Sequence, residues 1–179
     1  MEMLSKLIGG IFLVTIFSLT AFAQSHQEDV KFSMYPAKVY KGQISIPSYY
    51  VRSEGVWRDE LGKQTAPPAI NFGGKYFVGL HSCGTDCRYY TLTDLSTGKN
   101  LNSLDIFSSD GEKPSKTKDG RTYVTDLVTR ANSMLVVAQY HVNEGFRNPA
   151  ECRQRFFLFD SNAKKLDPVT GTINHCGIQ

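Results

Sequence analysis

The segment that decides the fold is Asn71–Lys99, NFGGKYFVGLHSCGTDCRYYTLTDLSTGK. It predicts a β-hairpin, because apolar and polar residues alternate over Lys75–Ser82 and again over Arg88–Asp94. The crossing between the two strands is Cys83–Cys87, and Ser96–Gly98 reads as the turn that follows the hairpin. A hairpin at the centre of the chain favours a fold built mainly from β-strands.

Outward from this hairpin, other segments carry the same short alternation, and none shows a sustained apolar stripe with the period of a helix. The further strands predicted are Phe32–Tyr40, Gln43–Ile46, Leu101–Phe107, Arg121–Val128, Ser133–His141, Arg153–Asp160 and Lys165–Val169. A strand, a cysteine-bearing connection, a second strand and an aspartate-to-lysine turn occur at Lys75–Lys99 and again at Ser133–Lys165. We therefore expect a mainly β domain with at most one short helix, arranged as an antiparallel sandwich, a barrel or a small propeller-like stack of hairpins.

The N-terminal residues follow the three-part pattern of a secretory signal peptide. Lys6 precedes an apolar run, Leu7–Leu19, which is too short to cross a bilayer and ends before Ala21-Phe22-Ala23. We expect cleavage after Ala23, so that residues 24–179 form a single β-rich domain in a periplasm or outside the cell. No later apolar run has the length of a membrane span, so we expect no membrane insertion after cleavage.

The formal net charge of +3 excludes few partners by itself. Lysines and arginines do not gather into a run interleaved with aromatic residues, which is the pattern expected of a nucleic-acid surface. We therefore expect no nucleic-acid partner, and the sequence indicates no cofactor.

Four cysteines follow the expected cleavage site: Cys83, Cys87, Cys152 and Cys176. An even count in an oxidising compartment predicts two disulfides. We favour Cys83–Cys87 with Cys152–Cys176, for which chain entropy gives about 2 and about 3.5 kcal/mol. A crossed pairing of Cys83 or Cys87 with Cys152 is the alternative. Gly84 suits the tight first loop, which needs a residue at positive φ.

The central segment resembles a group of small exported bacterial proteins of unknown function. Their pattern runs Asn-Phe-x-Gly-x-Tyr, Cys-Gly-x-x-Cys and Asp-x-x-Thr-Gly-Lys. The matching residues here are Asn71, Phe72, Gly74, Tyr76, Cys83, Gly84, Cys87, Asp94, Thr97, Gly98 and Lys99. Many members have a tryptophan and a glycine where this chain has His81 and Ser82. The resemblance implies an exported domain and no particular activity.

The sequence offers little that is typical of an enzyme. Three residues separate Cys83 from Cys87, whereas thiol oxidoreductases place two between their cysteines at a helix N-terminus. The chain contains no Gly-x-Ser-x-Gly elbow, no His-Glu-x-x-His and no phosphate loop. Several acids are available as paired carboxylates, but no spacing brings two of them together; they are Asp59, Glu60, Asp105, Asp110, Glu112 and Asp126. We therefore predict no catalytic residues.

A metal site or a reactive thiol is the more specific alternative to cysteines that serve only as structural disulfides. His81 and Cys83 lie on one face of the predicted strand, with Cys87 close by. Imidazole and thiolate ligands suit zinc or copper(I), and the further candidates for such a site are His141, His175 and Cys176. The spacing matches no established zinc pattern and disulfides would consume the thiolates, so we predict no metal ligands.

The aromatic residues favour a binding function. Adjacent pairs such as Tyr49-Tyr50, Tyr89-Tyr90 and Phe156-Phe157 must point to opposite faces of a strand, so some rings are expected at the surface unless both faces are covered. Exposed aromatics beside arginines are typical of protein interfaces. The candidate binding residues are Trp57, Tyr89, Phe146, Arg147 and Arg153.

These observations favour an exported, non-enzymatic domain that binds another protein, such as an inhibitor or an immunity protein. The alternative is a metal- or thiol-dependent protein that uses His81, Cys83, Cys87 and His175. A third interpretation is a structural component of the cell envelope.

Overall fold

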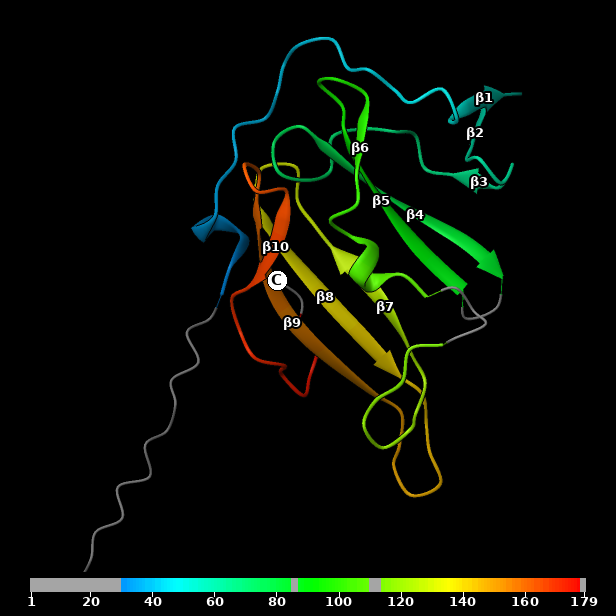
Figure 1. Cartoon of the computed structure of the whole chain (residues 1–179), viewed down its shortest axis with the longest axis vertical. Coiled ribbons are helices and arrows are strands. Elements are labelled where there is room, and N and C mark those ends of the chain that lie inside the picture. Colours follow the sequence, from blue (N-terminus) through cyan, green and yellow to red (C-terminus); the bar gives the residue numbers. More distant parts are fainter. Residues whose placement is uncertain (1–29, 85–86, 110–113, 178–179) are drawn as a thin grey trace, which may run out of the picture.

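The computed structural model describes residues 30–84, 87–109 and 114–177 (Figure 1). The expected signal peptide, Met1–Ala23, lies outside these residues. The strands are β1 Val51–Ser53, β2 Val56–Arg58, β3 Gln64–Thr65, β4 Tyr76–Gly84, β5 Cys87–Asp94, β6 Lys99–Leu101, β7 Tyr123–Val128, β8 Leu135–Val142, β9 Glu151–Asp160 and β10 Lys165–Pro168. Two short 3₁₀ helices, η1 (Phe32–Met34) and η2 (Asp105–Phe107), complete the described elements, among which there is no α-helix.

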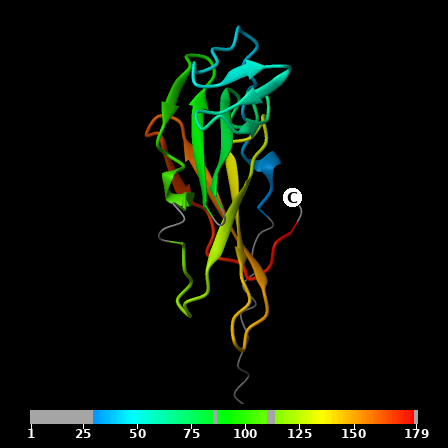
Figure 2. The same ribbon diagram turned by 90° about the vertical axis from the view of Figure 1, so that its right-hand side faces the viewer.

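The strands form three antiparallel sheets, which confirms the mainly β prediction. One sheet has the order β4-β5-β6, a second has β10-β9-β8-β7, and a small third has β1-β2-β3. Each sheet is open and none of them closes into a barrel. The barrel prediction is therefore wrong, and a sandwich of stacked hairpins describes the architecture (Figures 1 and 2).

The weak internal repeat in the sequence corresponds to two similar meanders, β4-β5-β6 and β8-β9-β10. The last two strands of each are joined by a tight turn, across which Asp94 pairs with Lys99 and Asp160 pairs with Lys165. In both turns the aspartate carboxylate accepts a backbone N–H from two residues later, at 3.0 Å and 2.8 Å. An aspartate of this kind closes a turn by imitating a backbone acceptor.

The main core lies between the two large sheets. Side chains of β4 and β5 meet those of β8 and β9 there, joined by residues of η2; the buried members are Phe72, Tyr76, Tyr90, Leu92, Leu104, Phe107, Val136, Ala138, Phe157 and Phe159. Phe159 joins the two sheets, because its ring centroid is 5.6 Å from that of Phe72 and 5.1 Å from that of Tyr76. Tilted and edge-on contacts of this kind stabilise beyond the area that they bury.

Each large sheet is also covered on its other face. Behind β8 and β9, Phe156 packs with Phe32 and Val137 in a second core. Behind β4 and β5, Phe77 packs with Tyr50 and Leu95 in a third core, against which Trp57 of the small sheet lies. Adjacent rings therefore do point to opposite faces, but both faces are buried, and most of the aromatic residues fill cores instead of the surface.

The predicted strands Phe32–Tyr40 and Gln43–Ile46 are wrong. This segment contains η1 and otherwise crosses the outside of the sandwich, bonding to turns of other segments: the Tyr40 N–H donates to the carbonyl of Gly74 at 2.7 Å, and the Ser45 N–H to that of Leu95 at 2.7 Å. Its alternating residues therefore cover sheets without joining one.

The prediction of one strand over Leu101–Phe107 is also wrong. The strand β6 ends at Leu101, and the chain then turns into η2, which places Leu104 and Phe107 in the main core. A three-residue spacing of apolar side chains suits a 3₁₀ turn, where residues i and i+3 share a face.

The disulfides are Cys83–Cys87 and Cys152–Cys176, which confirms the favoured pairing and shows that the crossed alternative is wrong. The first spans the loop end of the β4–β5 hairpin, where Gly84 has the positive φ (+148°) predicted for it. The second ties the C-terminal segment to β9, beside the paired backbone bonds between Gln154 and Ile173 at 2.9 and 2.8 Å.

A buried and an exposed phenylalanine provide a test of this core. Phe72 is 0% exposed between the sheets, whereas Phe146 is 97% exposed. We expect Phe72→Ala to lower the free energy of unfolding by about 3–5 kcal/mol, because it leaves a cavity. Phe146→Ala is expected to change it by less than about 0.5 kcal/mol. Urea denaturation followed by circular dichroism measures both, and equal losses in the two variants would contradict the packing described.

Candidate functional site

A polar cluster is buried on the outer face of the β4–β5 hairpin. On this face Phe77, Gly79 and His81 of β4 lie opposite Thr93, Thr91 and Tyr89 of β5. His81 is 1% exposed, and its ring stacks on that of Tyr89 with centroids 4.6 Å apart and planes 10° apart. The alternation that directs one face of this hairpin into the main core therefore also places an imidazole on the opposite face, where solvent hardly reaches it.

Gly79 leaves the space that Tyr50 fills. A Cβ atom at Gly79 would lie 2.4 Å from the Tyr50 hydroxyl and 2.7 Å from Thr91 Oγ1. The Tyr50 hydroxyl lies 3.1 Å from His81 Nε2, and Thr91 Oγ1 lies 3.0 Å from the same nitrogen. Burial raises the pKa of Tyr50, so its hydroxyl stays protonated and remains able to donate. The Nε2 side of the imidazole is thus held by two hydroxyl groups.

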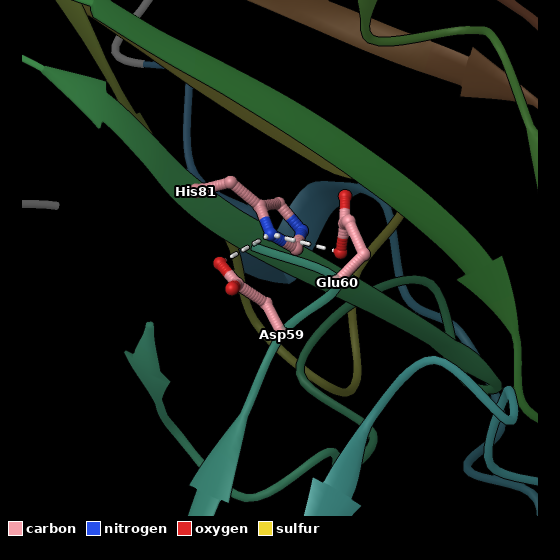
Figure 3. A group of neighbouring side chains, drawn as sticks. All are labelled: Asp59, Glu60 and His81. Atoms are coloured by element: carbon pink, nitrogen blue, oxygen red, sulfur yellow. Dashed lines mark hydrogen bonds and ion pairs between the residues drawn. The ribbon is translucent and has the colours of Figure 1, made fainter. Parts of the chain in front are cut away.

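Asp59 holds the other side of the imidazole. It follows β2, and its Oδ2 lies 3.1 Å from His81 Nδ1 (Figure 3). Its Oδ1 accepts the backbone N–H groups of Leu61 at 3.0 Å and Lys63 at 2.9 Å. Burial by itself would raise the pKa of Asp59, but the hydrogen bonds from Lys63, His81 and Leu61 outweigh it and hold this pKa below its ordinary value. The carboxylate is therefore ionised and fixed in orientation.

Glu60 brings a second carboxylate to the same nitrogen. Its Oε2 lies 3.6 Å from His81 Nδ1 (Figure 3). Its Oε1 accepts the Tyr89 hydroxyl at 2.6 Å. Burial and this hydrogen bond raise the pKa of Tyr89, which keeps the phenol a donor. The Glu60 side chain is 35% exposed, so the cluster opens to solvent on this side.

The order of carboxylate, imidazole and hydroxyl in this cluster resembles an acyl-transfer triad, but its accessibility does not. In such a triad the hydroxyl at Nε2 must reach a substrate. Here Nε2 faces Tyr50, which is 5% exposed, and the open side is the one where two carboxylates face Nδ1. The arrangement suits the binding of a cation better than nucleophilic attack.

The proposed cysteine-containing cluster does not form. Cys83 and Cys87 are bonded to each other, so neither offers a thiolate to His81. His141 instead pairs with Asp126, with Nε2 3.2 Å from Oδ2, and His175 is exposed. Among the described residues, the single group of potential metal ligands that converges is Asp59, Glu60 and His81.

The predicted binding residues fall in separate places. Trp57 is half-buried over the third core, and Tyr89 belongs to the cluster around His81. Phe146 and Arg147 are exposed in the loop between β8 and β9, with the Arg147 guanidinium carbon 5.6 Å from the Phe146 ring centroid. Arg153 pairs with Glu151 at 2.6 Å.

Arg153 also lines a surface hollow of about 540 Å³ at the base of the loop between β8 and β9. The hollow is framed by lysines and tyrosines, which include Lys116, Lys118, Tyr123 and Tyr140. Arg153 Nε is buried and has no hydrogen-bond partner among the described residues. The hollow therefore presents cationic and aromatic groups together.

The sequence pattern missed the partnership of Asp59 and Glu60 with His81. The sequence offers both acids as candidates for paired carboxylates, but 20 residues lie between Glu60 and His81 in the chain. The available signal was Gly79, two residues before His81, since a glycine within a strand marks the close approach of another segment; that segment is the one that carries Tyr50, and no signal pointed to the two acids. Asp110 and Glu112, two other candidate acids, lie outside the described residues.

No family model matches this sequence, and neither a curated protein nor a solved structure shows significant similarity to it.

The fit of Tyr50 over Gly79 makes a prediction about packing. We expect Gly79→Ala to cost about 1–3 kcal/mol of stability, because the new methyl group overlaps the Tyr50 hydroxyl. In the double variant with Tyr50→Phe, the loss should be smaller than the sum of the two single losses. Gly171→Ala is the control, since a Cβ there meets nothing within 4 Å. Strictly additive losses in thermal unfolding would refute the contact.

The ionised state of Asp59 makes a prediction about pH. Its folded pKa is depressed, so the unfolded chain binds the proton more tightly than the folded one. Asp59 therefore stabilises the fold above its unfolded pKa of about 4, and this contribution disappears as the pH falls through the lower folded pKa. We expect Asp59→Asn to cost about 1–3 kcal/mol at neutral pH and progressively less in acid. Urea unfolding between pH 3 and 7, without divalent cations and beside an Asp105→Asn control, measures the difference; a loss that is independent of pH would exclude this role.

Proposed function

We propose that this protein is an exported, non-enzymatic domain that binds another protein through the loop between β8 and β9. The observation that carries the proposal is Phe146, whose side chain is 97% exposed at the end of this hairpin. The hairpin extends past the other described elements at the lower end of the molecule in both views (Figures 1 and 2). Large exposed aromatic groups are the anchors on which protein interfaces most often depend.

The loop is ordered by its own contacts before any partner arrives. Gly145 and Asn148 exchange backbone hydrogen bonds at 2.8 and 3.3 Å, which closes a tight turn with Phe146 and Arg147 at its tip. A preformed loop loses less conformational entropy on binding than a mobile one. The geometry thus supports a rigid recognition element such as those that inhibitors present.

Arg121 packs against the loop and holds it in place. Its side chain is 8% exposed, and its guanidinium donates to the carbonyl of Pro149 at 3.0 Å and to Asp119 at 2.9 Å and pairs with Glu151. Its aliphatic part lies under Gly145, where a Cβ would be 2.9 Å from Arg121 Cδ. A side chain at Gly145 would therefore push the tip away from its support.

The chemistry of the tip indicates the kind of partner. Phe146 requires an apolar pocket, and Arg147 beside it favours carboxylates at the rim of that pocket. Lys116, Lys118 and Arg153 line the hollow at the base of the hairpin beside a single acid, Asp119, and add positive charge to this face. An acidic protein with an apolar recess fits this face, and an inhibitor or immunity protein against such a target is the role we favour.

The proposal requires that the protein is exported to the periplasm or out of the cell. Both cysteine pairs are oxidised, which is compatible with a periplasmic or secreted protein. In the part of the chain that the structure describes, no helix has the length and hydropathy of a membrane span.

The test compares partner capture by the wild-type protein with capture by two single variants. Phe146→Ala is expected to weaken the complex about 30-fold, which corresponds to the 2 kcal/mol or more lost at an interface anchor. Ile106→Ala is the matched control, because Ile106 is 68% exposed but lies in η2. Affinity capture from periplasmic and culture fractions identifies the partner, and surface plasmon resonance with the purified partner gives the dissociation constants.

Equal affinity of the Phe146→Ala variant and the wild-type protein would contradict the proposed interface. Capture of no partner, together with self-association into multimers in sedimentation experiments, would instead favour the structural envelope component.

A further inference from the structure

We propose that Asp59, Glu60 and His81 bind a Zn²⁺ ion, which links the loop after β2 to the β4–β5 hairpin. This site is separate from the loop between β8 and β9 and does not depend on the proposed protein-binding function. The three ligand atoms come from two segments that are 21 residues apart in the chain, and they lie within 4.8 Å of one another.

The distances between these atoms fit a zinc ion. Zinc bonds to imidazole nitrogen and carboxylate oxygen are about 2.0–2.2 Å long, so neighbouring ligands of a tetrahedral ion stand about 3.3–3.5 Å apart. His81 Nδ1 is 3.1 Å from Asp59 Oδ2 and 3.6 Å from Glu60 Oε2. The two carboxylate oxygens lie within 4.8 Å of each other, so a bound zinc ion requires the side chains to draw them together.

Each ligand is oriented by a second contact that leaves one atom directed to the common point. Asp59 uses Oδ1 to accept the backbone N–H groups of Leu61 and Lys63, which leaves Oδ2 for the ion. Glu60 uses Oε1 to accept the Tyr89 hydroxyl, which leaves Oε2. Outer contacts of this kind fix the ligands of metal sites in proteins.

The hydroxyl groups at His81 Nε2 allow the imidazole to bind a metal through Nδ1. A metal-bound imidazole is neutral and carries its proton on the nitrogen away from the ion. Thr91 Oγ1 at 3.0 Å is an acceptor for that proton, with the Tyr50 hydroxyl 3.1 Å away on the same side. Zinc therefore replaces a proton on Nδ1 without leaving Nε2 unbonded.

Charge balance also favours a divalent cation. Two carboxylates converge on one nitrogen, and within the described part of the chain neither of them has an ion pair with a lysine or an arginine. A proton on Nδ1 satisfies Asp59 at 3.1 Å but leaves Glu60 Oε2 at 3.6 Å, beyond a normal hydrogen bond. A single ion with a charge of +2 binds both carboxylates.

The ligand set selects among divalent ions. Calcium takes six to eight oxygen ligands and magnesium prefers oxygen ligands with several waters, whereas zinc accepts a mixture of imidazole and carboxylate. Three protein ligands leave the fourth zinc position to water on the side of Glu60, which is 35% exposed. This exposure also gives the ion a route into the site.

The test is a calorimetric titration of the chelator-treated, tag-free protein with zinc chloride. We expect one Zn²⁺ per chain and a rise in the melting temperature on binding. Glu60→Gln is expected to weaken zinc binding by at least about tenfold, and Tyr89→Phe, which removes the hydrogen bond that orients Glu60, by about tenfold. Both positions are partly open to solvent, so these variants are chosen over Asp59 and His81, whose replacement endangers the fold.

Glu144→Gln is the matched control, because Glu144 is exposed in the loop between β8 and β9. It should bind zinc with the wild-type affinity, and calcium chloride should give no comparable heat with any variant. Absence of stoichiometric zinc binding, or equal zinc affinity of the Glu60→Gln and wild-type proteins, would overturn the proposal; the second result means an adventitious ion only. Neither result bears on partner capture through Phe146, so the two proposals fail independently.

Discussion

The contact of Phe159 with Phe72 and Tyr76 is the interaction on which the rest of the structure depends. It joins one large sheet to the other at the centre of the main core. Strand residues alternate between the two faces of a sheet. This contact fixes which residues face inward, and it therefore also fixes which residues lie on the outer face of each sheet. Phe156 must then face the second core, and Phe77 the third.

The sequence predicted the parts of the fold that depend on local alternation. The central hairpin, the strands around Val124, Val136 and Phe157, and both disulfides follow from period-two patterns and cysteine spacing. The N-terminal segment shows the same alternation yet forms no strand, because its N–H groups bond to turns of distant segments. A pattern of alternation shows that a segment has two faces, but it does not show whether the segment joins a sheet or covers one.

The candidate site was only half visible in the sequence for a related reason. The sequence marks Asp59, Glu60 and His81 as residues able to act as acids, bases or ligands, but it suggests cysteines as the partners of His81. Neighbours on one face of a strand are the partners that a sequence suggests first, whereas the carboxylates observed at His81 come from the separate loop after β2, and it is Tyr50 that packs over Gly79. What the sequence lacks is the long-range packing that brings Tyr50 and the loop after β2 over the hairpin.

Stability alone does not account for a cluster of this composition. Burying an imidazole and a carboxylate costs desolvation free energy that the contact between them only partly returns, and apolar side chains of similar volume often serve a core as well or better. Here each polar group is aligned by another: Leu61 and Lys63 orient Asp59, Tyr89 orients Glu60, and Thr91 holds the imidazole. Such alignment gives one fixed position to an imidazole nitrogen and two carboxylate oxygens, which a core does not need and a bound ion does. Phe146 lies on a hairpin of the other large sheet and shares no described contact with this cluster, so the proposed ion at His81 and the proposed partner at the tip would act on separate parts of one scaffold.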